Sequence, residues 1–84
     1  MADITIYTTK VCPYCVRAKD LLKRKGQTYK EIDVADDKLR EEMIAKSGGR
    51  RSVPQIFING KHIGGSDDLY ALDHAGKLDA LLAA

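Results

Sequence analysis

The sequence has 84 residues, and its 14 basic and 12 acidic side chains give a formal net charge of +2. This length suits one domain over residues 1–84, and so balanced a charge argues against nucleic-acid binding, which usually needs a clustered basic face, although it suits a small anionic substrate. No apolar run approaches the ~18 residues of a membrane span and the first residues show no secretory signal, so we expect a soluble cytoplasmic protein.

The chain begins with a predicted strand and a predicted helix. The run Ile4–Thr8 is rich in β-branched side chains, which favours a strand. Pro13 suits the first position of a helix, because its fixed φ fits there and its missing N–H would have no partner. The helix should run to about Lys25, with Gly26 as its stop. Its apolar stripe comprises Cys15, Ala18, Leu21 and Leu22.

A second strand and helix follow. The strand is marked by Tyr29, Ile32 and Val34. Asp36 or Asp37 is expected to cap the helix, which should run through about Lys46 before the Ser47-Gly48-Gly49 break. The residues of this helix expected to face inward are Leu39, Met43 and Ile44.

The next segment predicts a β-hairpin. Val53–Ile58 should form a third strand, with Pro54 near its start, where a missing hydrogen-bond donor is tolerated. Asn59-Gly60 is the strongest short hairpin signal in the sequence, and it joins this strand to Lys61-His62-Ile63.

The chain is expected to end in a helix capped by Ser66, with Asp67 and Asp68 in its first turn. His74-Ala75-Gly76 should interrupt this helix before a last turn from Leu78 to Leu82. The predicted order is therefore βαβαββα, an α/β fold. A βαβ unit needs parallel strands and a short hairpin needs antiparallel ones, so we expect a mixed four-stranded sheet with helices on both faces.

The two cysteines of the chain occur as Cys12-Pro13-Tyr14-Cys15, the spacing of a redox-active dithiol. If Pro13 begins the helix, the Cys12 sulfur caps it and faces the free N–H groups of Tyr14 and Cys15, which favours the thiolate. Cys15, one turn further on and on the apolar side, should keep its proton. The nearby charges of Lys10 and Arg17 should also favour the Cys12 thiolate.

Two other interpretations of the cysteines are open. They are small buried apolar side chains in the first, or half of a zinc or iron–sulfur site in the second. A closed metal site needs about four ligands, and the remaining candidates, His62 and His74, are isolated in the sequence. A short loop between the cysteines also makes a structural disulfide ineffective. The redox interpretation is therefore favoured, with no metal site.

With these motifs placed, the chain resembles the small dithiol glutaredoxins, particularly the bacterial glutaredoxin 3 type. The resemblance rests on Cys12-Pro13-Tyr14-Cys15, on Ser52-Val53-Pro54 and on Gly64–Asp68, and it spans essentially the whole chain. It implies the thioredoxin fold, in agreement with the predicted element order.

The resemblance also implies a glutathione site. It implies a cis Pro54 facing Cys12, with the Val53 backbone pairing with the cysteine of glutathione like an added strand. Gly65, Ser66 and Asp67 match positions that hold the γ-glutamyl end. The remaining matching positions are Ser52, where the family usually has Thr, Lys10 and Arg40 for the glycine carboxylate, and Tyr14 for the aromatic lining.

The activity implied is glutathione-dependent reduction of protein disulfides and protein–glutathione mixed disulfides, with Cys12 as nucleophile and Cys15 as resolving thiol. Glutathione would be a co-substrate, with no tightly bound cofactor. The family admits ribonucleotide reductase among the protein clients, and a monomer is the default. Two alternatives are a redoxin recycled by thioredoxin reductase and an iron–sulfur module bridged by two subunits. The loop with Arg50 and Arg51 looks one residue longer than in close relatives, which leaves their contacts open.

Overall fold

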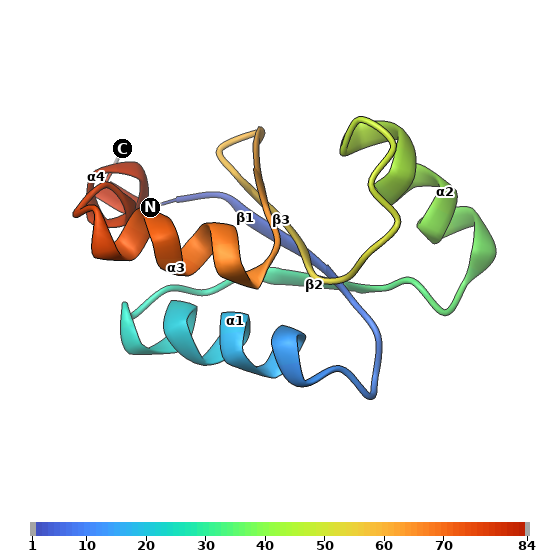
Figure 1. Ribbon diagram of the computed structural model, residues 1–84, viewed down its shortest axis with the longest axis horizontal. Coiled ribbons are helices and arrows are strands. Elements are labelled where there is room, and N and C mark those ends of the chain that lie inside the picture. Colours follow the sequence, from blue (N-terminus) through green and yellow to red (C-terminus); the bar gives the residue numbers. More distant parts are fainter. Residues whose placement is uncertain (1, 84) are drawn as a thin grey trace.

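The computed structural model describes residues 2–83, so the first and last residues of the domain predicted over residues 1–84 lie outside it. The elements are β1 (Ile4–Thr8), α1 (Pro13–Arg24), β2 (Lys30–Asp33), α2 (Asp37–Lys46), β3 (Gln55–Ile58), β4 (Lys61–Gly64), α3 (Ser66–His74) and α4 (Leu78–Ala83) (Figure 1). Among the helices of this range, none is long and apolar enough to cross a membrane.

The four strands form one mixed sheet in the order β2-β1-β3-β4. β1 pairs with β2 in parallel, and it pairs with β3 in the antiparallel direction. β3 and β4 are antiparallel neighbours. The predicted mixed four-stranded sheet is confirmed. Both strand directions follow from the connections, since α1 crosses over between β1 and β2 whereas a two-residue turn joins β3 to β4.

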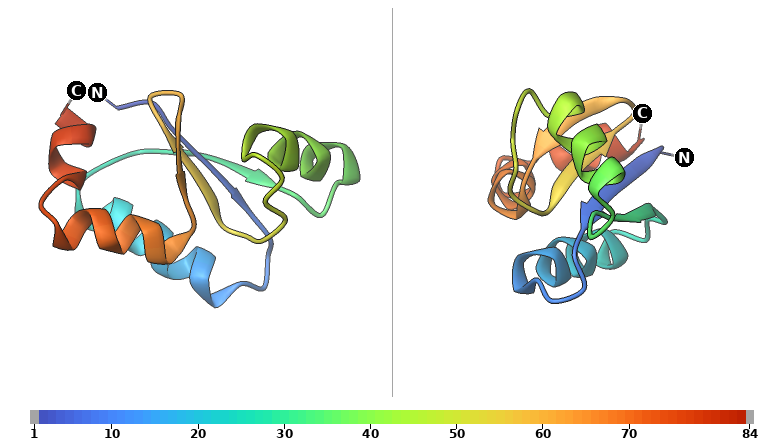
Figure 2. Two further views of the ribbon diagram at one scale, coloured as in Figure 1. Left: turned by 45° about the horizontal axis from the view of Figure 1, so that its top comes forward. Right: turned by 90° about the vertical axis from the view of Figure 1, so that its right-hand side faces the viewer.

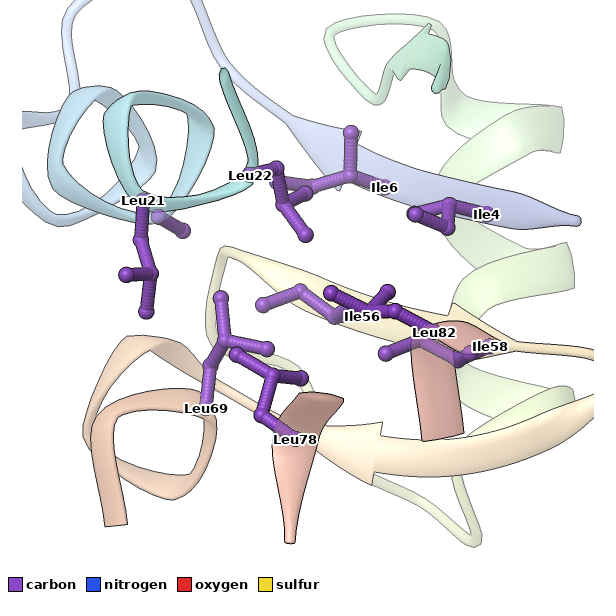
Figure 3. Close-up of a cluster of buried hydrophobic side chains, with 10 residues drawn as sticks. Ile4, Ile6, Leu21, Leu22, Ile56, Ile58, Leu69, Leu78 and Leu82 are labelled. Atoms are coloured by element: carbon purple, nitrogen blue, oxygen red, sulfur yellow. The ribbon is translucent and has the colours of Figure 1, made fainter. Parts of the chain in front are cut away.

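The main core lies between the sheet and the helices α1, α3 and α4. Inward side chains of β1 and β3 meet the apolar stripe of α1 there, and Leu22 is fully buried among them. Figure 3 shows these side chains pointing toward one another from strand and helix. The buried residues of this cluster are Ile4, Ile6, Ala18, Leu21, Leu22, Ile56, Ile58, Leu69, Leu78 and Leu82.

The other face of the sheet carries a smaller cluster under α2, made of Tyr7, Val34 and Met43. Figure 2 shows α1 and α2 on opposite sides of the strands, as predicted. The Tyr7 hydroxyl donates a hydrogen bond to Glu42 Oε2 over 3.0 Å. Burial of this hydroxyl raises the pKa of Tyr7 to about 12, and the hydrogen bond and negative charge of Glu42 add to the rise. The prediction that Leu39 faces inward is wrong. It is 36% exposed, because it lies a turn before the part of α2 that packs on the sheet.

Several predicted boundaries shift. β3 begins at Gln55 rather than at Val53, since Val53 and Pro54 make no ladder pair with β1. β2 begins one residue after Tyr29 and ends before Val34. The predicted last turn is a separate helix, α4, because Gly76 adopts a left-handed φ of 73° after α3.

The prediction that Ser66 caps α3 is also wrong. The capping position is Gly65, and Ser66 is the first helical residue. Glycine has no side chain to close the helix start, but Asp68 Oδ2 accepts a hydrogen bond from the Gly65 N–H over 2.9 Å, as the acidic member of a capping box does. This arrangement leaves the Ser66 hydroxyl out of the cap.

The predicted Asn59-Gly60 turn is present. Both residues have positive φ, 53° and 80°, as a type I′ hairpin requires. The Asn59 side chain also accepts from the Asp3 N–H over 2.9 Å and donates to the Leu81 carbonyl over 3.3 Å. The turn therefore connects the hairpin to α4 and to the residue that precedes β1.

Candidate active site

The start of α1 positions the two cysteines differently. Cys12 is the N-cap residue with extended backbone, and Pro13 follows it as predicted. The Cys15 N–H donates to Cys12 Sγ over 3.2 Å, so the sulfur takes one of the amides left free at the helix start. The sequence predicted that the amides of Tyr14 and Cys15 would both face this sulfur. Of the two, the Cys15 amide forms the hydrogen bond. The Cys12 sulfur thus lies at the positive end of the helix dipole.

Cys15 lies beneath the surface, with 1% of its area exposed, and both cysteines are free thiols. Burial raises the pKa of the Cys15 thiol to about 12, and its interaction with Cys12 adds to the rise, whereas a backbone hydrogen bond with Thr9 and the charge of Lys19 oppose it. Cys15 therefore keeps its proton at neutral pH, as the sequence predicted. The pair is chemically unequal.

The segment before β3 lies against Cys12. The Val53–Pro54 peptide bond is cis, as the resemblance implied. The Cys12 thiol points toward the Val53 carbonyl oxygen, with 3.9 Å between sulfur and oxygen. Because Val53 lies outside the sheet ladders, its main chain is available beside the sulfur.

The start of α3 adjoins the same segment. A Cβ placed on Gly65 would lie 3.4 Å from the Pro54 carbonyl oxygen, so the two backbones nearly touch. In the first turn of α3, Asp68 Oδ2 lies 3.6 Å from Arg50 Nη2. The structure therefore brings Cys12, Val53-Pro54 and Gly65–Asp68 together. Arg50 joins them, a residue whose contacts the sequence left open.

Ser66 is the most distinctive polar group of this region. It is 4% exposed, and its Oγ is buried without a hydrogen-bond partner. A buried hydroxyl without a partner is uncommon in native proteins and needs an explanation, such as a ligand that completes it. Figure 1 shows α1 and α3 running in the same direction, each with its N-terminus at the right-hand end of the helix. Their positive dipole ends thus point in the same direction, which suits an anionic ligand.

The other predicted contact residues lie at differing places. Tyr14 is 55% exposed in the first turn of α1, and Lys10 is exposed in the loop before it. Ser52 accepts from the buried Gln55 amide, at both its carbonyl (2.9 Å) and its hydroxyl (3.2 Å). Arg40 lies in α2, and the contacts that join Cys12, Val53 and Gly65 do not include it.

The side chains of Arg17 and His62 have partners that the sequence did not suggest. The Arg17 guanidinium stacks 5.3 Å from the centre of the Tyr70 ring, so it contacts α3 in place of Cys12. His62 Nε2 lies 2.7 Å from Gln55 Oε1. Gln55 uses its amide nitrogen as donor to the Ser52 carbonyl, so its oxygen must face His62, whose Nε2 is then the donor. No group of three or more His, Cys, Asp or Glu residues within residues 2–83 could hold a metal ion.

The contacts of Asp68 could have been anticipated from the Gly65-x-x-Asp68 spacing, which is that of a capping box. The orphaned Ser66 hydroxyl had no local signal, because Ser at a helix start usually indicates a cap. The approach of Arg50 depends on the course of a loop, and its sequence gave no sign of it.

Comparison with known proteins gives one consistent result. A family model described as glutaredoxin matches residues 4–63. Glutaredoxin 3 of Escherichia coli strain K12 is 52% identical over 82 residues, which cover 98% of this chain and 99% of that protein. The solution structure of a glutaredoxin from Brucella melitensis is 58% identical, with a TM-score of 0.84, and the match covers 98% of this chain and 89% of that one. The crystal structure of a buckwheat glutaredoxin–glutathione complex has a TM-score of 0.89 at 31% identity, and the match covers 98% of this chain and 77% of that one.

Proposed function

Because the chain belongs to the glutaredoxin family of thiol–disulfide oxidoreductases and has its thioredoxin fold, we propose that glutathione is its reducing co-substrate. The observation that carries this proposal is the buried Ser66 hydroxyl without a partner at the start of α3, a helix whose first turn adjoins Pro54. The α-carboxylate of the γ-glutamyl group would accept from this hydroxyl and from the free amides of the helix start. Asp67 would receive the α-ammonium.

The middle of glutathione would lie along Val53. Its cysteine backbone would pair with the Val53 main chain, as an added strand does, and its sulfur would then meet Cys12 Sγ. Ser52, held by Gln55, would fix the start of this segment. Lys10 and Arg40 would receive the glycine carboxylate, and Tyr14 would cover the peptide. The buckwheat glutaredoxin–glutathione complex among the similar structures supports a site for this tripeptide.

The geometry suits a reaction that needs one cysteine. The Cys12 thiolate attacks the glutathione sulfur of a protein–glutathione mixed disulfide, and the S–S bond breaks as the new one forms. The protein leaves as a thiolate and takes up a proton. A second glutathione thiolate then attacks the glutathione sulfur on Cys12, which yields glutathione disulfide and restores the Cys12 thiolate.

Reduction of a protein disulfide would use both cysteines. Cys12 attacks one sulfur of the client and forms a mixed disulfide, releasing the other client sulfur as a thiol. Cys15 loses its proton and attacks Cys12 Sγ, which frees the client and forms the Cys12–Cys15 disulfide. Two glutathione molecules reduce this bond. The clients would be disulfide-containing or glutathionylated proteins, with ribonucleotide reductase among the candidates, and the protein would act as a monomer in the reducing cytoplasm.

The test is a comparison of reductants. The protein would be supplied either with glutathione, glutathione reductase and NADPH, or with thioredoxin reductase and NADPH, on a glutathionylated peptide and on a peptide disulfide. We expect turnover of both substrates with the glutathione system. Turnover that depends on thioredoxin reductase alone would overturn the proposal and favour a redoxin recycled by that enzyme.

A further inference from the structure

Three side chains form a polar network behind the buried cysteine. Glu31 Oε2 on β2 accepts a hydrogen bond from the Thr8 hydroxyl over 2.7 Å and from Lys19 Nζ over 3.0 Å. Thr8 is 2% exposed at the end of β1, and Lys19 lies on α1. One carboxylate oxygen thus joins two strands and a helix. Both hydrogen bonds lower the pKa of Glu31, and its carboxylate in turn raises the pKa of Lys19, so the pair is charged at neutral pH.

This network adjoins Cys15 on two sides. Lys19 follows Cys15 by four residues on α1, so the two side chains are neighbours on one helix face. Thr9, next to Thr8 in the chain, has a backbone hydrogen bond with Cys15. Besides burial, the groups that shift the pKa of the Cys15 thiol are Cys12, Lys19 and the Thr9 backbone. The neighbours that shift the pKa values of the Lys19–Glu31 pair are Thr8, Tyr29, Asp33 and Cys15. Among these neighbours of Cys15, Lys19 is the one that carries a positive charge.

The network also borders solvent. A hollow of about 450 Å³ is lined by Thr8, Thr9, Lys10, Lys19, Glu31 and Asp33. The Lys19 and Glu31 side chains are 23% and 40% exposed, and ion pairs of this exposure contribute little to stability. The contacts that assemble Cys12, Val53-Pro54 and Gly65–Asp68 do not involve this pair. Its position therefore favours a role specific to Cys15.

We propose that Lys19, held in place by Glu31 and Thr8, is a positioning residue for the resolving step, in which its ammonium group stabilises the Cys15 thiolate as that thiolate forms. The proposal rests on the proposed function, in which Cys15 attacks the mixed disulfide on Cys12. In that step the Cys15 S–H proton passes to solvent or to the departing thiolate. The Cys12–client S–S bond breaks, the Cys12–Cys15 bond forms, and the client thiol carries away the electron pair. A cation fixed one turn from Cys15 lowers the cost of the thiolate in a buried setting.

The test is a stopped-flow reaction of the reduced protein with the symmetrical disulfide of a fluorescent cysteine peptide. The first peptide thiol leaves when Cys12 attacks, and the second leaves when Cys15 attacks. We expect Lys19→Met to slow the second phase by about 3- to 10-fold at neutral pH and to leave the first phase unchanged, since one pKa unit alters the thiolate fraction tenfold. The pH profile of the second phase should move to higher pH.

Three variants complete the experiment. Lys19→Arg should restore the second phase, because the cation is kept. Lys23→Met removes a lysine charge from the exposed last turn of α1 and should change neither phase. A second phase of unchanged rate and pH profile in Lys19→Met, or equal slowing of both phases, would overturn the proposal. Cys15→Ser must lack the second phase. If it keeps that phase, or if the unmodified protein has none, the resolving role itself fails, whatever Lys19 does.

Discussion

The Cys12 sulfur lies 3.9 Å from the carbonyl oxygen of Val53, 41 residues away along the chain. This contact places the sulfur of the half-buried Cys12 beside a stretch of main chain that belongs to no strand. The adjoining start of α3 then supplies free amides and the Ser66 hydroxyl. The proposed glutathione site would therefore lie beside the sulfur of Cys12.

Replacement of Ser66 by alanine should separate binding from stability. Its hydroxyl has no partner, so Ser66→Ala should leave the free energy of unfolding within about 0.5 kcal/mol of the unmodified value. The KM for glutathione should rise about tenfold, the cost of one hydrogen bond to a charged group. Steady-state kinetics and urea unfolding measure the two effects.

Ser47→Ala is the matched control. Ser47 is buried like Ser66, but its hydroxyl donates to the Ile44 carbonyl and accepts from the Arg50 N–H. Its loss should cost about 1 kcal/mol of stability. A Ser66→Ala protein that is destabilised while its KM for glutathione stays the same would contradict the proposed role of this hydroxyl.

Alkaline pH should weaken the fold through two buried groups. Burial raises the pKa of Cys15 from 9.0 and that of Tyr7 from 10.0, each to about 12. The folded state therefore keeps protons that the unfolded state loses, so the free energy of unfolding should fall as pH rises from 9 toward 12. Each group adds a slope of about 1.4 kcal/mol per pH unit within its own range.

Urea unfolding across this pH range checks the expectation. Tyr7→Phe should remove part of the slope between pH 10 and 12, and Cys15→Ser should remove part of it from pH 9 upward. Stability curves that run parallel for all three proteins would show that these groups do not titrate with folding.

The Asn59 turn should matter for stability and not for chemistry. Its side chain bonds to Asp3, just before β1, and to α4, and its backbone has a φ of 53° that alanine adopts poorly. We expect Asn59→Ala to cost about 2 kcal/mol, from two hydrogen bonds and backbone strain. Lys61→Ala, at an exposed residue two positions further along the hairpin, is the control. Thiol–disulfide exchange rates of the folded Asn59→Ala protein should equal those of the unmodified protein; slower exchange would contradict this separation.

The sequence predicted those features that local rules determine. Pro13 after Cys12 indicated a helix start, Asn59-Gly60 indicated a tight turn, and the β-branched run Ile4–Thr8 indicated the first strand. These rules also gave the mixed sheet, because connection lengths fix strand directions. The inequality of Cys12 and Cys15 followed from their places at a helix start and one turn inside it.

Local rules failed where a distant partner decides the outcome. Ser66 is a good capping residue, but Asp68 already satisfies the Gly65 amide, so the hydroxyl is left free. Val53 has a strong strand preference, yet the Val53-Pro54 segment packs against Cys12 and Gly65 outside the sheet. The Lys19–Glu31 pair requires α1 to pack beside β2, with Glu31 opposite Ile6 in the parallel register. The spacing of residues along the sequence does not predict how β1 and β2 are aligned.

Cys12 and Cys15 are proposed to have different roles, Cys12 as the nucleophile and Cys15 as the resolving thiol. The most direct test measures the turnover of Cys12→Ser and Cys15→Ser on two substrates, with glutathione as the reductant. Cys12→Ser should lose activity on both a glutathionylated peptide and a protein disulfide. Cys15→Ser should keep its activity on the glutathionylated peptide and lose reduction of the protein disulfide. Equal loss of both activities in the two variants would contradict the account.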